Sequence, residues 1–279
     1  MLLLSVELIL TTEQELKGNN RMTKIDESSP SIALITGGSR GLGRSAALHL
    51  ARHGVDIVLT YQQQKDAAQA LVQEIQQLGR KAVAIQLDVG NIASFPSFIQ
   101  SLSEALTTHW HTNRFTMLLN NAGIGAHQPF AEFSEEQFNL LMNVHLKGVF
   151  FLTQQLLPLI EDGGRILNVS SGLTRFSLPG YSAYAAMKGA VEVLTRYWAK
   201  ELGDRGISVN VLAPGAIETD FGHGAVRDNA QLNQFVANQT ALGRAGLPDD
   251  IGAVAAALLV RDTQWINGQR IEASGGMFL

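Results

Sequence analysis

The sequence predicts a doubly wound α/β domain, in which one parallel sheet of seven strands carries helices on both faces. Short apolar runs alternate with longer helical patterns from Ser31 onward, as in successive β-α-β units. These runs are almost uninterrupted in valine, isoleucine and leucine, which indicates strands buried on both faces. Because no repeat, low-complexity stretch or linker divides the 279 residues, we expect a single domain.

Seven segments carry the pattern of a buried strand. They are residues 31–36, 56–60, 82–87, 115–120, 164–170, 207–213 and 269–273. Helical patterns fill the gaps, for instance at about 42–52, 66–78 and 134–160, and the last of these opens with the capping sequence SEEQ.

Two segments depart from this alternation. Residues 1–28 begin with an apolar run that no Lys or Arg precedes and that Glu7 interrupts, which argues against a signal peptide or membrane anchor. We expect a flexible extension there, followed by one domain over residues 29–279. The stretch at about 216–245 lacks a strand pattern and begins where a strand ends, so we expect a substrate lid, with a surface insertion as the alternative.

Composition narrows the possible partners and sites. The net charge is −4, with no long basic run, so we expect no nucleic-acid partner and no membrane partner. The absence of cysteine excludes disulfides, thiolate metal sites and cysteine nucleophiles. His127, His145 and His223 are not placed with carboxylates at metal-ligand spacing, so we interpret them as structural or lid residues and expect no metal. We expect a cytoplasmic protein with a small-molecule substrate.

A glycine-rich turn follows the first strand and precedes the first helix. Gly37, Gly41 and Gly43 allow a tight turn and let backbone N–H groups approach a phosphate, and the helix N-terminus adds partial positive charge. Glycines also serve other sharp turns between a strand and a helix. Their place at the first such turn of an alternating domain favours a dinucleotide site.

The end of the second strand favours one cofactor over another. A carboxylate there would bind the adenosine ribose of NAD and repel a 2′-phosphate. The sequence after residue 60 has no acid before Asp66, whereas Arg40 lies in the glycine turn and Lys65 is nearby. We therefore expect a preference for NADP(H), with NAD(H) possible. Arg40 as a solvated turn residue is the alternative.

Six motifs in order, TGGSRGLG, LDVG, NNAG, NVSSG, YAAMK and PGAIET, carry a resemblance. From about Ser31 to its end, the chain resembles the short-chain dehydrogenase/reductase family, and within it the 3-oxoacyl-ACP reductases and ketoreductases. This resemblance implies a Rossmann-like fold and a set of cofactor contacts. They are Gly37, Ser39, Arg40, Gly41, Leu42, Gly43, Tyr61, Asp88, Val89, Asn120, Ala122, Gly123, Tyr184, Lys188, Pro214, Gly215, Ile217 and Thr219.

The same resemblance implies four catalytic residues. They are Asn143, Ser171, Tyr184 and Lys188. It implies that Ser171 bonds the substrate oxygen and that Asn143 holds a water linked to Lys188. Taken alone, a helical asparagine and a serine after a strand more often make local hydrogen bonds.

Spacing distinguishes the two tyrosines near Lys188. Residues four apart lie on one face of a helix, so Tyr184 has Lys188 beside it, whereas Tyr181 has only Ala185 at that offset. A nearby cation favours the phenolate. We therefore expect Lys188 to lower the pKa of Tyr184, and Tyr181 to be a pocket wall.

These residues predict an NADPH-dependent oxidoreductase that transfers a hydride between the nicotinamide and a ketone or secondary alcohol, with a 3-oxoacyl thioester or small carbonyl as substrate. An NAD-dependent alcohol or polyol dehydrogenase and a non-catalytic NADP-binding regulatory protein are the alternatives. The resemblance further implies a homotetramer, or a homodimer, formed through helices at about 134–160 and 180–202 and the last helix and strand.

Overall fold

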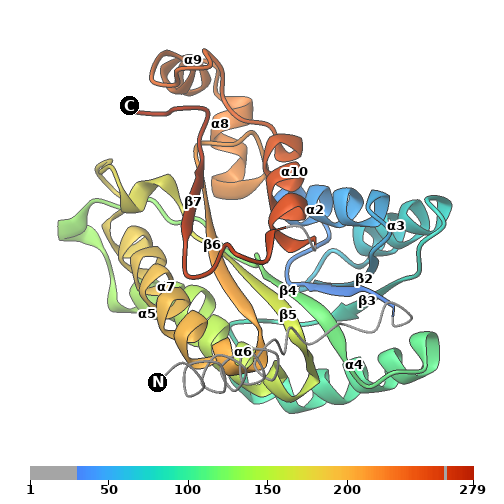
Figure 1. Cartoon of the computed structure of the whole chain (residues 1–279). Coiled ribbons are helices and arrows are strands. Elements are labelled where there is room, and N and C mark those ends of the chain that lie inside the picture. Colours follow the sequence, from blue (N-terminus) through green and yellow to red (C-terminus); the bar gives the residue numbers. More distant parts are fainter. Residues whose placement is uncertain (1–29, 261–262) are drawn as a thin grey trace, which may run out of the picture.

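The seven expected strands form one parallel sheet in the order β3-β2-β1-β4-β5-β6-β7 (Figure 1). This computed structural model describes residues 30–260 and 263–279, so the extension expected at 1–28 lies outside the described residues. The strands are β1 (Ile32–Ile35), β2 (Asp56–Tyr61), β3 (Ala82–Gln86), β4 (Phe115–Asn120), β5 (Ile160–Val169), β6 (Ser208–Pro214) and β7 (Arg270–Ala273).

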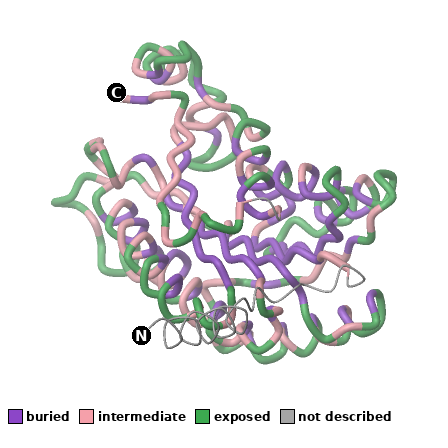
Figure 2. The backbone as a smooth tube through the Cα atoms, viewed as in Figure 1, coloured by how far each residue is buried: buried purple, intermediate pink, exposed green. Residues whose placement is uncertain are grey.

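Helices cover both faces of the sheet, as expected. One layer contains α2 (Gly41–Arg52), α3 (Lys65–Gln77) and α10 (Pro248–Leu259), and the other contains α4 (Phe95–Trp110), α6 (Gly148–Leu156) and α7 (Ser182–Glu201) (Figure 1). Strand β1 shows how the two layers form, because Ala33 and Ile35 join the first core while Ile32 and Leu34 join the second. Burial is accordingly concentrated along the strands and the inner helix faces (Figure 2).

The strand order reverses at β1, which pairs with β2 on one side and with β4 on the other. The connections from β1 and β4 therefore leave in opposite directions at the carboxyl edge of the sheet. Open α/β sheets bind ligands in the crevice at such a point.

The helix expected over 134–160 is interrupted. It comprises α5 (Glu135–Met142), a π-helical turn (Asn143–Lys147), α6 and a 3₁₀ turn (Leu157–Leu159). Strand β5 also begins four residues before the expected residue 164. Gly163 has a φ of 77°, and the pairing with β4 shifts from Phe115–Ile160 to Met117–Arg165, so the strand continues through an irregularity that the two glycines make possible.

The stretch at 216–245 holds two short helices, α8 (Ala225–Asp228) and α9 (Ala230–Asn238), after a 3₁₀ turn at Phe221–Gly224. It follows β6, and α9 lies near the chain's C-terminus in Figure 1. Within the described residues, no helix has both the length and the apolar character needed to cross a bilayer.

Candidate active site

The glycine turn brings α2 against the end of β1. Gly37 and Gly41 have φ values of 64° and 54°, which favour glycine. A Cβ on Gly43 would lie 2.4 Å from the Gly37 carbonyl oxygen and 2.6 Å from Asn121 Nδ2, so no other residue fits without a shift. The turn is thus packed tightly against the helix N-terminus, and residues of this kind fit a dinucleotide pyrophosphate.

Hydrogen bonds fasten the NNAG segment to this turn. The Thr36 hydroxyl accepts from the backbone N–H groups of Asn121 and Ala122, both at 3.0 Å, and Asn121 Nδ2 donates to the carbonyls of Thr36 at 2.9 Å and Gly37 at 3.0 Å. Gly37 N–H in turn donates to the Thr60 hydroxyl at 3.1 Å. Sequence reasoning missed Asn121, although the pair of asparagines in the motif was a signal for it.

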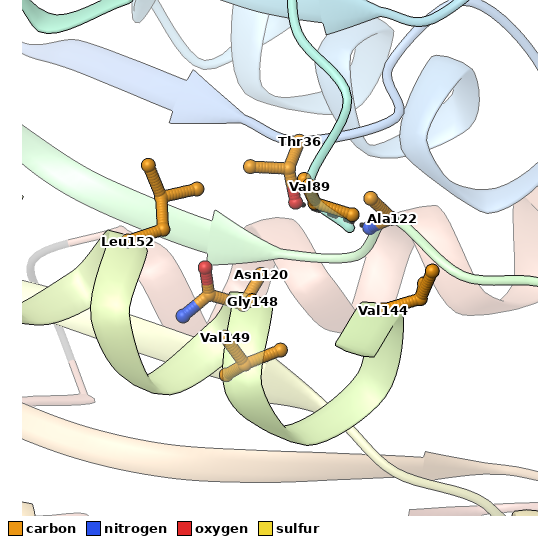
Figure 3. A pocket seen from close by; sticks show the side chains of 8 residues that line it. All are labelled: Thr36, Val89, Asn120, Ala122, Val144, Gly148, Val149 and Leu152. Carbon is orange, nitrogen blue, oxygen red and sulfur yellow. Dashed lines mark hydrogen bonds between the residues drawn. The ribbon is translucent and has the colours of Figure 1, made fainter. Parts of the chain in front are cut away.

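A small pocket opens beside this segment, between the end of β4 and the π-helical turn with α6 (Figure 3). Its walls include Val89, Asn120 and Ala122, three of the expected cofactor contacts. Asn120 serves the interior of the domain, because its Nδ2 donates to Asn168 Oδ1 at 2.9 Å and to the Thr153 hydroxyl at 3.0 Å. Asn120 therefore lies beneath the crevice, where its hydrogen bonds hold β4 against β5 and α6.

The other expected adenosine contacts differ in exposure. Ser39 is buried in the turn, Leu42 packs on the core, and Tyr61 is buried at the end of β2. Asp88 is exposed, and its carboxylate accepts from Gly90 N–H at 2.9 Å.

Arg40 stands at the mouth of the turn, as expected for a 2′-phosphate contact, but it already has a partner. Its Nη1 donates to Asp220 Oδ2 at 3.3 Å, and its side chain is 60% exposed. Asp220 also pairs with Arg227, which is the main reason that its pKa is lowered. A bound phosphate would thus compete with Asp220 for Arg40.

Helix α7 places Tyr184 and Lys188 together, as the four-residue spacing predicts. Both side chains are buried, and Lys188 Nζ lies 5.7 Å from the centroid of the Tyr184 ring and donates to the Val169 carbonyl at 2.8 Å. Ser171 follows β5, accepts from Leu173 N–H at 3.2 Å and lies near enough to Tyr184 to act on the pKa of its phenol. Three of the four expected catalytic residues therefore meet at one point.

The expected lowering of the Tyr184 pKa is wrong for this structure. Burial raises the pKa of the phenol and outweighs the lowering by the Ser171 hydrogen bond. Burial also lowers the pKa of Lys188 from its usual 10.5 to about 8. Spacing on a helix places two groups on one face, but it does not show that both lie away from water.

The structure places His145, rather than the side chain of Asn143, against Tyr184. Asn143 begins the π-helical turn and is half-buried, and its side chain makes no hydrogen bond within the described residues. The rings of His145 and Tyr184 meet edge to face, with centroids 5.2 Å apart and an interplanar angle of 88°. The role of Asn143 stays a prediction, and no signal in the sequence marked His145.

Glu192 is a second residue that sequence reasoning missed. Its Oε1 accepts from the Ser170 hydroxyl at 2.7 Å, the Thr174 hydroxyl at 2.6 Å and Arg270 Nε at 2.9 Å. Arg270 also reaches the Ser171 carbonyl at 3.4 Å. This cluster joins β5, α7 and β7 directly behind Ser171.

The segment after β6 reaches both halves of the site. Ile217 pairs with Gly246 in a parallel bridge, and Gly215 lies so close to Ser274 that a Cβ would be 2.9 Å from its Cα. The Thr219 methyl would lie 3.6 Å from a Cβ on Gly41, which places this expected contact beside the glycine turn. Two residues later, the Phe221 ring lies 5.7 Å from that of Tyr184.

The other two histidines lie apart from this centre. His127 packs on Tyr181, with ring centroids 4.9 Å apart, and His223 occupies a turn with a φ of 60°. Across residues 30–260 and 263–279, no group of three or more His, Asp or Glu side chains could hold a metal ion.

Fold and site together define a dinucleotide-binding oxidoreductase, with the glycine turn on one side of the crevice and a buried tyrosine–lysine pair on the other. A family model described as enoyl-(acyl carrier protein) reductase matches residues 37–278. The chain belongs to the short-chain dehydrogenase/reductase family.

The chain is also similar to individual reductases and ketoreductases. A hydroxynaphthalene reductase of Aspergillus fumigatus is 32% identical over 251 residues, which cover 86% of this chain and 90% of the relative. The promiscuous reductase LugOII, which catalyses keto-reduction at C1 in lugdunomycin biosynthesis, has a TM-score of 0.85 at 34% identity, over 90% of this chain and 99% of that one. The angucycline C-6 ketoreductase LanV, crystallised with NADP, has a TM-score of 0.85 at 33% identity, over 89% and 95%.

Proposed function

We propose that the protein reduces a ketone on a flat ring system to a secondary alcohol with NADPH, and that Tyr184 supplies the proton. The observation that carries the proposal is the meeting of Tyr184, Lys188 and Ser171 in a buried cluster that faces the segment after β6. The predicted preference for NADP(H) agrees with the NADP bound to LanV.

The chemistry divides between cofactor and protein. NADPH, when bound, supplies the hydride to the carbonyl carbon. Burial keeps the phenol of Tyr184 protonated, so it is in the form that can donate a proton to the carbonyl oxygen. Ser171 donates a hydrogen bond to that oxygen and orients the substrate, and the ammonium of Lys188 stabilises the phenolate that the proton leaves behind.

Aromatic side chains around Tyr184 favour a flat substrate. The Phe221 ring lies 5.7 Å from its ring, at an angle of 58°, and Tyr181 is close enough to affect the pKa of Tyr184. The names of the relatives point to naphthalene-based and angucycline ketones. We therefore propose ring ketones ahead of linear 3-oxoacyl thioesters, with residues 216–245 acting as the lid that covers them.

The test is NADPH oxidation with a panel of bicyclic ring ketones and a 3-oxoacyl thioester. Tyr184→Phe should lower kcat by about 10³-fold, because proton transfer by a positioned group contributes 10²–10⁴-fold. Tyr181→Phe makes the same change three residues earlier and should stay within about 3-fold of the wild type. Equal rates for the two variants would contradict the role of Tyr184, and faster reduction of the thioester would contradict the substrate class.

We also propose a cytoplasmic homotetramer. Helices α5 and α7 expose apolar side chains to a degree that suits a subunit contact, with Phe138 41%, Leu140 53%, Val193 43% and Tyr197 64% exposed. Sedimentation equilibrium should give four times the chain mass, and Tyr197→Glu should reduce that mass. A monomer with full activity would contradict this assembly.

A further inference from the structure

His145 is buried beside the catalytic pair and has no role in the proposed chemistry so far. Its side chain is fully buried, at 0% exposure, and it comes from the π-helical turn between α5 and α6. Such single-turn π segments inside α-helices frequently occur at functional sites. The edge-to-face contact at 5.2 Å places the imidazole directly against Tyr184.

The hydrogen bonds of His145 determine its tautomer. Nε2 lies 2.8 Å from the Ile124 carbonyl oxygen, which can only accept, so Nε2 carries the hydrogen. Ile124 N–H also lies 3.3 Å from the same Nε2, and a hydrogen bond there would require the opposite tautomer. Because the contact with the carbonyl oxygen is shorter, we assign the hydrogen to Nε2. Nδ1 is then a bare acceptor.

The free nitrogen is the unusual feature. Among the buried side-chain nitrogen and oxygen atoms of the described residues, Nδ1 of His145 is the one without a hydrogen-bond partner. Burial, and next the charge of Lys188, lower the pKa of His145 to about 3, so the ring is neutral at physiological pH. Lys188 has three N–H donors, and one of them is used by Val169. Both residues lie against the Tyr184 ring, so an acceptor and spare donors occur in the same buried region.

We propose that His145 is a positioning residue for proton transfer: its ring holds the Tyr184 phenol, and its Nδ1 accepts a hydrogen bond from a water molecule that Lys188 also holds. This inference rests on the proposed function. In each turnover Tyr184 gives one proton to the alcohol oxygen and must regain one from solvent. The water passes that proton toward Tyr184, while His145 stays neutral and only orients it.

A purely structural role makes a different prediction. The ring is tightly packed, since a Cβ on Gly123 would lie 2.8 Å from His145 Cε1. If packing and the bond to Ile124 were its whole contribution, variants would lose stability and cofactor affinity in proportion to turnover. If Nδ1 orients a proton path, kcat falls while the KM for NADPH is preserved.

Two amide variants separate the two nitrogens. In His145→Asn the side-chain amide lies about as far from the backbone as Nδ1. In His145→Gln the side chain is one methylene longer, and its amide lies about as far as Nε2. We expect His145→Gln to keep the bond to Ile124 but to lower kcat about 10-fold or more, because an unmade buried hydrogen bond has that effect. His145→Asn should stay within about 3-fold of the wild type, and both should keep the KM for NADPH within about 2-fold.

Thermal unfolding of each variant, without cofactor, accompanies the kinetics. His145→Phe keeps an aromatic edge but neither nitrogen, and it should resemble His145→Gln in kcat. Full activity of His145→Gln, or equal losses in the Asn and Gln variants, would overturn the inference while the wild type turns over normally. Absence of wild-type turnover on every ketone would instead overturn the proposed function, and this inference with it.

Discussion

Replacing Lys188 with methionine tests whether the ammonium at the centre of the site is held there at the expense of stability. Burial lowers its pKa from 10.5 to about 8. With 4% of the residue exposed, solvent screening removes little of this effect. The shift corresponds to about 3 kcal/mol of destabilisation at pH 7, where the lysine is protonated in both the folded and the unfolded state.

The sign of the pH dependence follows from the two pKa values. Between pH 8 and pH 10.5 the unfolded chain binds more protons at this lysine than the folded chain, so stability rises with pH. The wild type should therefore gain about 1 kcal/mol relative to Lys188→Met between pH 7 and pH 9, and about 2.5 kcal/mol by pH 10. Lys188→Met also loses the hydrogen bond to the Val169 carbonyl. We treat this loss as independent of pH, so it cancels when the change in stability between two pH values is compared.

Urea unfolding of the proteins without cofactor, at one protein concentration, measures the effect. Lys200→Met is the matched control, because it makes the same change at an exposed lysine of the same helix, and its difference from the wild type should stay flat. A Lys188→Met difference that is constant from pH 7 to pH 10, or that moves the other way, would refute the burial argument. The variant should also lose turnover and bind NADPH more weakly.

Two further predictions concern the cofactor and the core. Arg40→Gln should lower kcat/KM for NADPH about 10-fold and leave that for NADH within about 2-fold, because a charged hydrogen bond to phosphate is lost; equal effects on both cofactors would count against the assignment of Arg40. Asp56→Ala should lower the free energy of unfolding by about 3 kcal/mol, because Arg80 Nε at 2.8 Å and Trp110 Nε1 at 2.7 Å lose their acceptor. In urea unfolding, a loss under about 1 kcal/mol would show that the cluster is not needed.

The sheet could be predicted because burial on both faces leaves a continuous apolar run in a central strand such as β1. The glycine turn and the Tyr184–Lys188 pair are likewise local: their geometry follows from spacing within one turn or one helix. The start of β5 was not predictable in this way, because Asp162 and Gly163 interrupt the apolar pattern while the strand continues through them.

The rest of the site depends on contacts between distant segments. A π-helical turn adds one residue to a helix but changes the apolar pattern of the sequence very little. The contact between His145 and Tyr184 could therefore not be predicted from that pattern. Glu192 lies in α7, but its partners come from β5 and β7, 22 residues before it and 78 after it. The pKa of Tyr184 depends on the walls around it, and a four-residue spacing contains no information about those walls.

The ion pair between Arg270 and Glu192 ties the catalytic centre to the last strand of the sheet. Every predicted catalytic residue precedes β7, yet the support behind Ser171 includes Arg270 from that strand. The support behind the serine is therefore the part of the site that comes last along the chain, whereas the glycine turn and the NNAG segment belong to its first half.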